Sequence, residues 1–347
     1  MPTVPAAELE RWSAEVLQRS GLVSVDARMA AQFITLANLR GVDSHGVALL
    51  PAYVQRLQAG GINPRPNLRL VVDLPGLAVM DGDHGIGHVA AARAMEEAVA
   101  RARRVGAAFV IVQHTEHFGA AAHYAMLAAQ NGMVGIALAN GDPTMAPWGG
   151  TTPLFGTNPI AIAVPGPEDD PVVLDMATSA SSWGRIALAA RRGEKIPRDW
   201  AFDRHGRPTD DPNEAIDGLM APLGGHKGYG LALMVDVLAG VLSGSAFAGH
   251  VPFKFKEAGR PQNVGALFAA LDIAAVMPLD TFRERMADLV RQVHASQRAP
   301  GTERILVPGE RSAEVRKRRE REGIPLSEDI ASDLRRLGDE VGVPFPG

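Results

Sequence analysis

The chain has no cysteine among its 347 residues. That absence excludes disulfides, zinc ribbons, iron–sulfur clusters and a thiol nucleophile. The chain also has no large excess of charge of either sign, because it contains 35 lysine and arginine residues and 39 acidic ones, for a net charge of −4. Bulk charge therefore does not favour a polyanion, and we expect no nucleic-acid partner. The basic run Arg316 to Glu322 is interleaved with glutamates and is typical of a solvated helix face.

Long apolar runs and a targeting segment are missing as well. The longest apolar helix candidate, Leu231 to Leu242, is interrupted by Asp236 and is too short to span a bilayer. The N-terminal sequence MPTVPAAELERW lacks the basic and then apolar layout of a secretory signal. We therefore expect a cytoplasmic protein without a membrane partner.

The composition that remains is that of an ordinary globular protein, with 46% hydrophobic and 21% charged residues. Apolar residues recur at helical spacing in roughly the first 60 and the last 65 residues. Between them, short β-type runs alternate with helical stretches, and glycine and proline mark the turns. The pattern predicts an α/β or α+β fold, with a polar surface excursion from Ala187 to Leu219.

The predicted elements of the middle and C-terminal regions are as follows. Strands are expected at 68–72, 77–80, 109–112, 134–138, 160–164, 172–174 and 268–273. Helices are expected at 89–105, 121–130, 231–242, 281–296 and 311–321, with a last helix capped by Ser327.

A glycine-rich segment, Gly-Ile-Gly-His-Val-Ala at 85–90, follows a predicted strand and precedes a predicted helix. This is the setting of a dinucleotide-binding fingerprint. A Rossmann unit also needs an acidic residue at the end of the next strand, about 20 residues on. Here that strand ends at His114 and Glu116 comes late. The alternative is a glycine turn that leads into a helix.

The segment Asp-Ser-His-Gly at 43–46 is a candidate catalytic element. Ser44 and His45 look like parts of a hydrolase, but adjacent side chains are expected to diverge and to miss the hydrogen bond that activates a serine. The sequence contains no G-x-S-x-G elbow. An acid/base His45 with a supporting hydroxyl fits better. The alternative is a helix C-cap with a polar surface histidine.

A second histidine-rich segment, His114-Thr-Glu-His117-Phe-Gly, follows a predicted strand, and His123 lies just beyond it. Three histidines and Glu116 would suit a metal, but the spacing matches no standard zinc site. Two interpretations stay open. One is a metal-dependent hydrolase or lyase that uses His114, His117 and His123. The other, which the pattern favours, is a catalytic histidine that hydrogen-bonds a carbonyl or hydroxyl oxygen.

The sequence Gly-Gly-His-Lys-Gly-Tyr-Gly at 224–230 precedes an apolar helix. A lysine at a helix N-terminus opposes the helix dipole, so Lys227 costs stability there. Backbone N–H groups together with Lys227 would make an anion site. The alternative is a glycine-rich hinge with an exposed lysine. Two further turn segments, 156–159 and 175–179, stand at strand ends, where α/β sheets bind ligands.

These segments belong to an ordered series. Along the chain it reads RGVDSHGV at 40–47, HFG at 117–119, APWGG at 146–150, FGTNPIAIAVP at 155–165, DMATS at 175–179, PTDDP at 208–212, GGHKGYGLALMVDVLAGVLSG at 224–244 and VPGE at 307–310. With this series nearly the whole chain resembles the malate/L-lactate dehydrogenase family of the non-Rossmann type. Ureidoglycolate dehydrogenase, sulfolactate dehydrogenase, diketogulonate reductase and piperideine-carboxylate reductase belong to that family.

The resemblance implies an oxidoreductase that uses NAD or NADP to interconvert a 2-hydroxy acid and a 2-oxo acid. It implies a non-Rossmann cofactor domain with a mixed β-sheet, beside a helical domain formed by both termini. We accordingly divide the chain into residues 1–73, 74–265 and 266–347. Family members are usually homodimers, and the G-x-G-x-x-A match is then not a cofactor fingerprint.

Carried over position by position, the resemblance assigns roles to individual residues. His45 and His117 match the two active-site histidines, Ser44 supplies a hydrogen bond, and Lys227 lies near cofactor and substrate. The segments that would line the cofactor are Asp175, Met176 and Ala177 together with Pro308, Gly309 and Glu310. No metal is implied.

The chain departs from the family pattern at two places. Leu49 stands where relatives often carry an arginine that pairs with a substrate carboxylate, and leucine cannot form such a pair. Plain lactate or malate is therefore in doubt unless Arg40, Arg185 or Lys227 takes the arginine's place, and a catalytically inactive cofactor-binding relative is a further alternative. Asn140 and the glycine after it replace a serine that relatives use near the cofactor.

Overall fold

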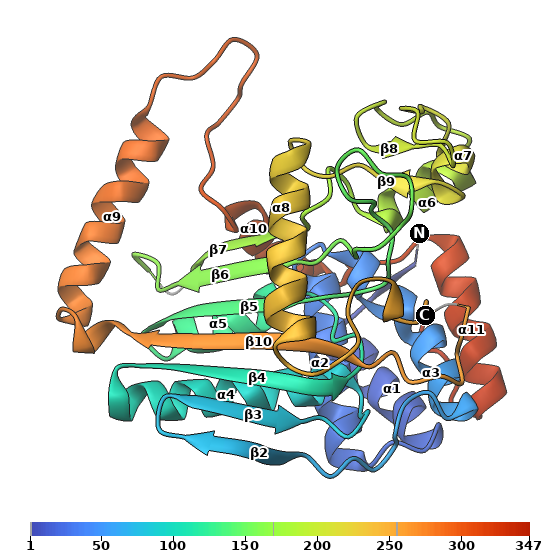
Figure 1. Cartoon of the computed structure of the whole chain (residues 1–347), viewed down its shortest axis with the longest axis horizontal. Coiled ribbons are helices and arrows are strands. Elements are labelled where there is room, and N and C mark those ends of the chain that lie inside the picture. The colour runs from blue at the N-terminus through green and yellow to red at the C-terminus, as the bar shows by residue number, and fades with distance from the viewer. Residues whose placement is uncertain (1, 169, 255) are drawn as a thin grey trace.

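The computed structural model describes residues 2–168, 170–254 and 256–347. Its centre is a seven-stranded sheet with the strand order β2-β3-β4-β10-β5-β6-β7 (Figure 1). The strands are β2 (Arg69–Leu74), β3 (Leu77–Asp81), β4 (Ala107–Thr115), β5 (Met133–Ala139), β6 (Ile160–Val164), β7 (Val172–Met176) and β10 (Val264–Asp272). The β3/β4 pair is parallel and the other neighbouring pairs are antiparallel, so the sheet is mixed.

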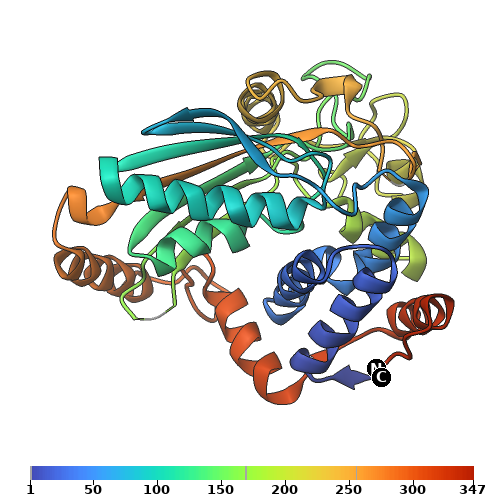
Figure 2. The same cartoon turned by 90° about the horizontal axis from the view of Figure 1, so that it is seen from below.

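Helices cover both faces of this sheet (Figure 2). Helices α4 (Gly87–Val105) and α5 (Ala122–Gln130) pack on one face, where their many alanines allow a close approach to the strands. Helix α8 (His226–Asp236) crosses the other face and continues as a π turn, Val237–Val241. The central strand β10 is buried along most of its length, as expected for a strand covered on both faces.

A helical part is built from both ends of the chain. Its helices are α1 (Ala6–Arg19), α2 (Ser24–Leu39), α3 (Leu50–Ala59), α10 (Glu310–Glu322) and α11 (Glu328–Val341). The short strands β1 (Thr3–Val4) and β11 (Ile324–Pro325) pair across the two ends, and the Trp12 indole donates a hydrogen bond to the Val343 carbonyl at 3.0 Å. One hydrophobic core joins the two ends, which lie side by side in Figure 2.

The predicted polar excursion after Ala187 is wrong in part. Its first residues belong to helix α6 (Trp183–Arg192), which buries Ile186 and Ala189. The rest holds the strands β8 (Ala201–Phe202) and β9 (Leu219–Met220) and the short helix α7 (Pro212–Ile216) around a small core of its own. Arginine-rich composition hid the helix, because its apolar stripe is only one side chain wide.

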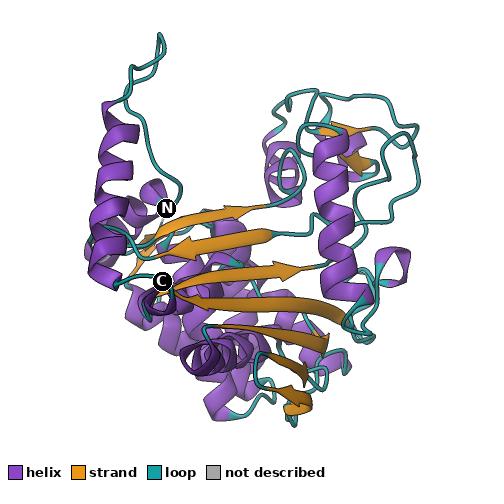
Figure 3. Cartoon of the chain, turned by 60° about the vertical axis from the view of Figure 1, so that its left-hand side comes forward, coloured by secondary structure: helices purple, strands orange, loops and turns teal. Residues whose placement is uncertain are grey.

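Helix α9 (Leu279–Ala295) stands apart from the rest of the molecule (Figures 1 and 3). None of its 17 described residues is buried. An amphipathic helix that buries nothing within its own chain has its apolar side turned to solvent.

Most predicted strands and helices are confirmed within a few residues, and Ser327 does cap α11 through a hydrogen bond from the Ile330 N–H. The start of α8 is corrected: the helix begins at His226, inside the glycine-rich motif, and not at Leu231. The predicted limits at 73 and 265 fall inside β2 and β10, so the division of the chain stays a prediction. Among the described helices, none is both long and apolar enough to cross a membrane.

Candidate active site

The Asp-Ser-His segment forms a 3₁₀ turn, Asp43–His45, directly after α2. The Asn38 side chain closes this turn, because its Oδ1 accepts a hydrogen bond from the Val47 N–H at 2.8 Å and its Nδ2 donates to Asp43 Oδ1 at 2.7 Å. Arg319 of α10 makes a two-pronged ion pair with Asp43, at 2.6 and 3.0 Å. Helix α10 thus holds the loop that carries His45. Arg319, which belongs to the basic run Arg316 to Glu322, points toward this loop and not to solvent.

Ser44 and His45 correct a sequence-based expectation. Their side chains do not diverge: Ser44 Oγ lies 3.0 Å from His45 Nδ1. The tight 3₁₀ turn brings the two neighbouring side chains to the same side. Ser44 can therefore orient the imidazole ring, which is the hydrogen-bonding role expected for it.

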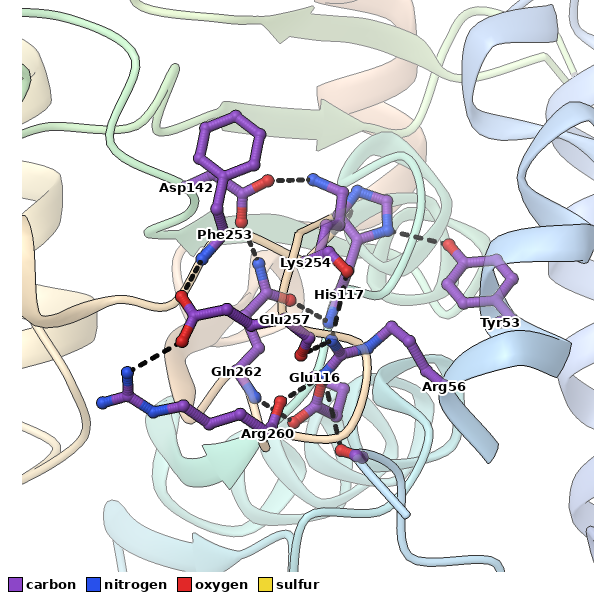
Figure 4. A network of polar contacts seen from close by, with 11 residues as sticks. Tyr53, Arg56, Glu116, His117, Asp142, Phe253, Lys254, Glu257, Arg260 and Gln262 are labelled. Carbon is purple, nitrogen blue, oxygen red and sulfur yellow. Dashed lines mark hydrogen bonds and ion pairs between the residues drawn. The ribbon is translucent and has the colours of Figure 1, made fainter. Parts of the chain in front are cut away.

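His117 follows the end of β4 and meets His45 there. The two rings are stacked, with centroids 5.8 Å apart and planes 24° from parallel. Tyr53 of α3 hydrogen-bonds His117, with 2.7 Å between Tyr53 Oη and His117 Nδ1 (Figure 4). Tyr53 is only 4% exposed, and burial raises the pKa of its phenol, so the oxygen keeps its proton.

A small pocket lies beside His117. It is lined by Leu49, Ala52, Tyr53, Arg56, Ile62, Glu116, His117 and Lys254. Leu49 therefore does face the space next to a candidate catalytic histidine. Among the described residues, the cations of the lining are Arg56 and Lys254, and not Arg40, Arg185 or Lys227.

Arg56 and Glu116 form a buried ion pair under this pocket (Figure 4). Arg56 Nη2 lies 2.5 Å from Glu116 Oε2, and the two side chains are 4% and 2% exposed. The other oxygen of Glu116 accepts a hydrogen bond from the Gln262 N–H at 2.6 Å. Burial raises the pKa of Glu116 to about 7, although the guanidinium acts in the opposite direction. Arg56 also donates to the backbone carbonyls of Gly61, Lys254, Glu257 and Arg260.

Lys254 forms a second ion pair nearby. Its Nζ lies 2.6 Å from Asp142 Oδ2, with the two side chains 17% and 6% exposed. The Gln262 amide donates to the other oxygen of Asp142 (Figure 4). Gln262 thus links the two ion pairs, because its backbone bonds Glu116 and its side chain bonds Asp142.

Both histidines are held in the neutral form. Burial lowers the pKa of His45 to about 4, and the Lys254 ammonium acts in the same direction. Burial and then Lys254 also hold the pKa of His117 well below its ordinary value. A neutral imidazole has an unprotonated ring nitrogen that can accept a proton, as a general base must, and the lowered pKa makes it a weaker base than an ordinary histidine.

The histidines of the metal interpretation do not come together. His114 lies 3.2 Å from Asp81, while His123 is buried and its ring stacks on Phe33 at 6.3 Å. His117 bonds Tyr53 instead. Within the part of the chain that the structure describes, no group of three or more such side chains is arranged to hold a metal ion.

The segments predicted to line the cofactor meet at β7. On one side of this strand the Val173 N–H donates to the Pro308 carbonyl at 3.0 Å. Gly309 has a φ of +88°, and a Cβ there would lie 3.0 Å from the Val173 backbone, so only glycine allows this approach. Glu310 accepts from the Val307 N–H at 2.9 Å and so fixes the turn. The Asp175–Ala177 segment and the 308–310 turn therefore adjoin each other.

The glycine-rich motif that carries Lys227, residues 224–230, lies near the other end of the segment 175–179. The Leu223 N–H donates to the Thr178 carbonyl at 2.9 Å, and a Cβ at Gly228 would press against that same carbonyl oxygen. Lys227 is exposed in the first turn of α8, beside Gly224 and its open surroundings. N–H groups of a first helical turn and a lysine beside them suit the phosphates of a dinucleotide. The chain from Asp175 to Thr178 thus lies between the 308–310 turn and the start of α8.

The G-x-G-x-x-A segment has another explanation. It does open α4 between two parallel strands, but a Cβ at Gly87 would collide with the Glu116 carbonyl oxygen. Protein backbone fills the space that a pyrophosphate would need. Asn140, the second departure, is also structural, because it bonds Asp236 and the Gly265 N–H inside the fold.

Comparison with known proteins agrees with this geometry. The family model described as malate/L-lactate dehydrogenase matches residues 4–335. Malate dehydrogenase of Pyrococcus horikoshii is 37% identical, over 98% of this chain and 96% of its own, and L-sulfolactate dehydrogenase of Methanocaldococcus jannaschii is 37% identical over 95% and 94%. The crystal structure of malate dehydrogenase from Entamoeba histolytica superposes with a TM-score of 0.96 at 31% identity, covering 100% and 99% of the two chains.

The mixed seven-stranded sheet and the family match together identify a dehydrogenase. The chain belongs to the malate/L-lactate dehydrogenase family. It is accordingly an NAD(P)-dependent dehydrogenase that acts on the CH–OH group of 2-hydroxy acids. Some relatives are named for NAD(+) and others for NADP(+).

Proposed function

We propose that this enzyme interconverts a 2-oxo acid and its 2-hydroxy acid at the pocket beside His117. The observation that carries the proposal is the stacked pair of His45 and His117, which lies partly buried at the end of β4, with Arg56 and Lys254 in the pocket beside His117. His117 can carry the proton, protonated for reduction and neutral for oxidation, and the Lys254 ammonium in the pocket lining suits an acidic substrate. Leu49 and Ile62 make the remaining wall apolar, which favours a substrate with an apolar side chain.

The protein's task in this reaction is to move a proton to and from the substrate oxygen. When bound, the nicotinamide supplies or accepts the hydride. Tyr53 occupies Nδ1 of His117, which leaves Nε2 to meet the substrate oxygen. Protonated His117 donates its Nε2 proton to that oxygen during reduction, and neutral His117 removes the proton during oxidation, while Ser44 and His45 support its stacked ring. Such acid–base help contributes roughly 10²- to 10⁴-fold to the rate.

The cofactor would lie along the edge of β7. Asp175, Met176 and Ala177 would line it on the sheet side, and Pro308, Gly309 and Glu310 would close it from the C-terminal turn. Lys227 would neutralise its phosphates at the start of α8. The adjacency of these segments supports the assignment, and NAD and NADP are both compatible with it.

We also infer that the enzyme is a homodimer. Helix α9 buries none of its described side chains within one chain, and α8 and its π turn expose Leu231, Met234, Val241 and Leu242. Clustered apolar side chains of this kind mark interaction surfaces. Light scattering of the purified protein is expected to give twice the mass of one chain.

The test of the proposed function is a reductase screen. Pyruvate, oxaloacetate and 2-oxo-4-methylpentanoate are each mixed with the enzyme and NADH or NADPH, and the loss of reduced cofactor is followed by absorbance. At least one acid is expected to be reduced. His45→Ala and His117→Ala are each expected to lower kcat by a factor of 10² or more while the reduced cofactor still binds. Near wild-type rates in both variants would refute the assignment of the site.

A further inference from the structure

A 2-oxo acid carries a carboxylate next to its reacting carbonyl, so its site needs a positive group close to the proton-donating histidine. Two cations line the pocket beside His117, and they differ in how they are held. Arg56 is buried in its ion pair with Glu116 and clamps backbone carbonyls from two segments. Its guanidinium therefore serves the structure under the pocket.

Lys254 is placed differently. It comes from the irregular segment between the π turn and β10, and its ammonium reaches the pocket from the side opposite Tyr53 (Figure 4). Its ion pair with Asp142 is itself anchored by Gln262, so the ammonium is held at a fixed place. Among charged groups, the Lys254 ammonium also has the largest effect on the pKa of His45 and of His117, and it lowers both.

We propose that Lys254 binds the carboxylate of the substrate and is the residue that selects 2-oxo acids over neutral ketones in this chain. The proposal rests on the proposed function and names the residue that recognises its substrate. Lys254 thereby does the work that Leu49 cannot do. Leu49 and Ile62 are then left to contact the substrate's side chain.

This placement has a consequence for the proton donor. In the free enzyme the ammonium disfavours a second positive charge on either histidine. A carboxylate bound at Lys254 cancels much of that repulsion, and a neighbouring negative charge favours the protonated imidazole. Binding of an acid therefore prepares His117 to donate its proton, whereas binding of a neutral ketone does not.

The experiment compares acids with their methyl esters, which keep the carbonyl and lose the negative charge. Pyruvate and 2-oxo-4-methylpentanoate, each beside its methyl ester, are assayed with the wild type, Lys254→Met and Lys254→Arg. Lys254→Met is expected to lower kcat/KM for the acids by about 10- to 150-fold, the range for a hydrogen bond to a charged group. The esters are expected to change by less than about threefold. Lys254→Arg is expected to keep most of the preference for acids.

Lys256→Met is the matched control. It removes an exposed lysine two residues away, whose ammonium lies 5.2 Å from the centre of the Phe253 ring, and it changes the net charge equally. It is expected to leave the preference for acids intact. The double variant Asp142→Asn/Lys254→Met removes both buried charges, so a loss of preference in a folded protein can be shown even if Lys254→Met alone is unstable.

A binding measurement separates this proposal from the proposed function. Oxamate is titrated into the enzyme saturated with NADH, and the wild type is expected to bind it at least tenfold more tightly than Lys254→Met. Equal affinities, equal losses for acids and esters, or no binding of oxamate by the wild type would each overturn the role of Lys254. Oxamate binding that depends on Lys254, without reduction of any 2-oxo acid, would leave this role standing and refute the proposed function.

Discussion

Replacing Tyr53 with phenylalanine removes a single oxygen from the site and keeps the buried ring. The lost contact is the 2.7 Å hydrogen bond to His117 Nδ1. Tyr53 also packs edge-on against His88, and phenylalanine preserves that contact. The substitution therefore tests the hydrogen bond and not the packing.

The expected size follows from the charge of His117. A hydrogen bond to a neutral group contributes about 0.5–1.5 kcal/mol and one to a charged group about 1.5–3 kcal/mol. The phenol thus favours the protonated imidazole by about 1 kcal/mol, and its loss lowers the pKa of His117 by somewhat under one unit. That pKa already lies well below its usual value, so the protonated fraction at neutral pH falls by about fivefold.

Reduction and oxidation respond differently. Tyr53→Phe is expected to lower kcat/KM for reduction by about fivefold at neutral pH and to move the pH profile toward lower pH by about 0.7 units. Oxidation, which needs the neutral imidazole, is expected to change by less than about threefold. The measurement is kcat/KM against pH in both directions with the best substrate pair of the screen.

The matched control is Tyr124→Phe. Tyr124 is fully buried and packs against Phe118, and its hydroxyl donates to the Phe118 carbonyl at 2.6 Å and not to a histidine. This variant is expected to lose stability with no shift of the pH profile. An unshifted profile in Tyr53→Phe, or equal shifts in the two variants, would refute the reasoning.

Three further predictions concern other positions. Leu49→Arg is expected to raise kcat/KM for oxaloacetate relative to 2-oxo-4-methylpentanoate by about 10-fold or more, and a wild type that already prefers oxaloacetate strongly would contradict the apolar role of Leu49. Lys227→Ala is expected to weaken cofactor binding, measured by fluorescence titration, while Tm stays equal or rises, because the lysine opposes the dipole of α8. His123→Phe is expected to flatten the loss of stability on acidification: burial lowers the pKa of His123 to about 3, so below its ordinary pKa the unfolded chain binds more protons and stability falls as pH falls. Urea unfolding between pH 6.5 and 4 should show a slope smaller by up to about 1.4 kcal/mol per pH unit, and an unchanged slope would exclude this histidine as a cause.

Local patterns predicted the fold well where structure is local. The strands and helices predicted in the middle region are confirmed, because the spacing of apolar residues and the positions of glycine turns indicate the same elements there. Helix α6 was missed because charged side chains outnumber its buried ones. The order of the strands was not predictable from pattern, since β10 comes late in the chain and pairs between β4 and β5.

The candidate site, like the fold, was predicted from the sequence only in part. His45 and His117 were found from short motifs, because each stands at the end of a regular element with turn residues beside it. The direction of the Ser44 side chain was predicted wrongly, because the sequence does not reveal the 3₁₀ turn that brings its hydroxyl to His45. Tyr53 was not predicted as a site residue, because nothing near it in the sequence marks its contact with His117, 64 residues away.

The position of Lys254 beside His117 could not be predicted from the sequence. The described residues around it, 251–254 and 256–263, form no helix or strand, so neither a helical nor a strand period constrains its position. Its position is imposed from outside, by Arg56 binding the Lys254 carbonyl across 198 residues and by Asp142 binding its ammonium across 112. Each partner is an ordinary charged residue in its own sequence context. A cation placed by distant partners can take the role of the arginine that relatives often carry where this chain has Leu49, and no sequence motif marks it. Substrate specificity in such a chain therefore depends on tertiary contacts between segments that are far apart in the sequence.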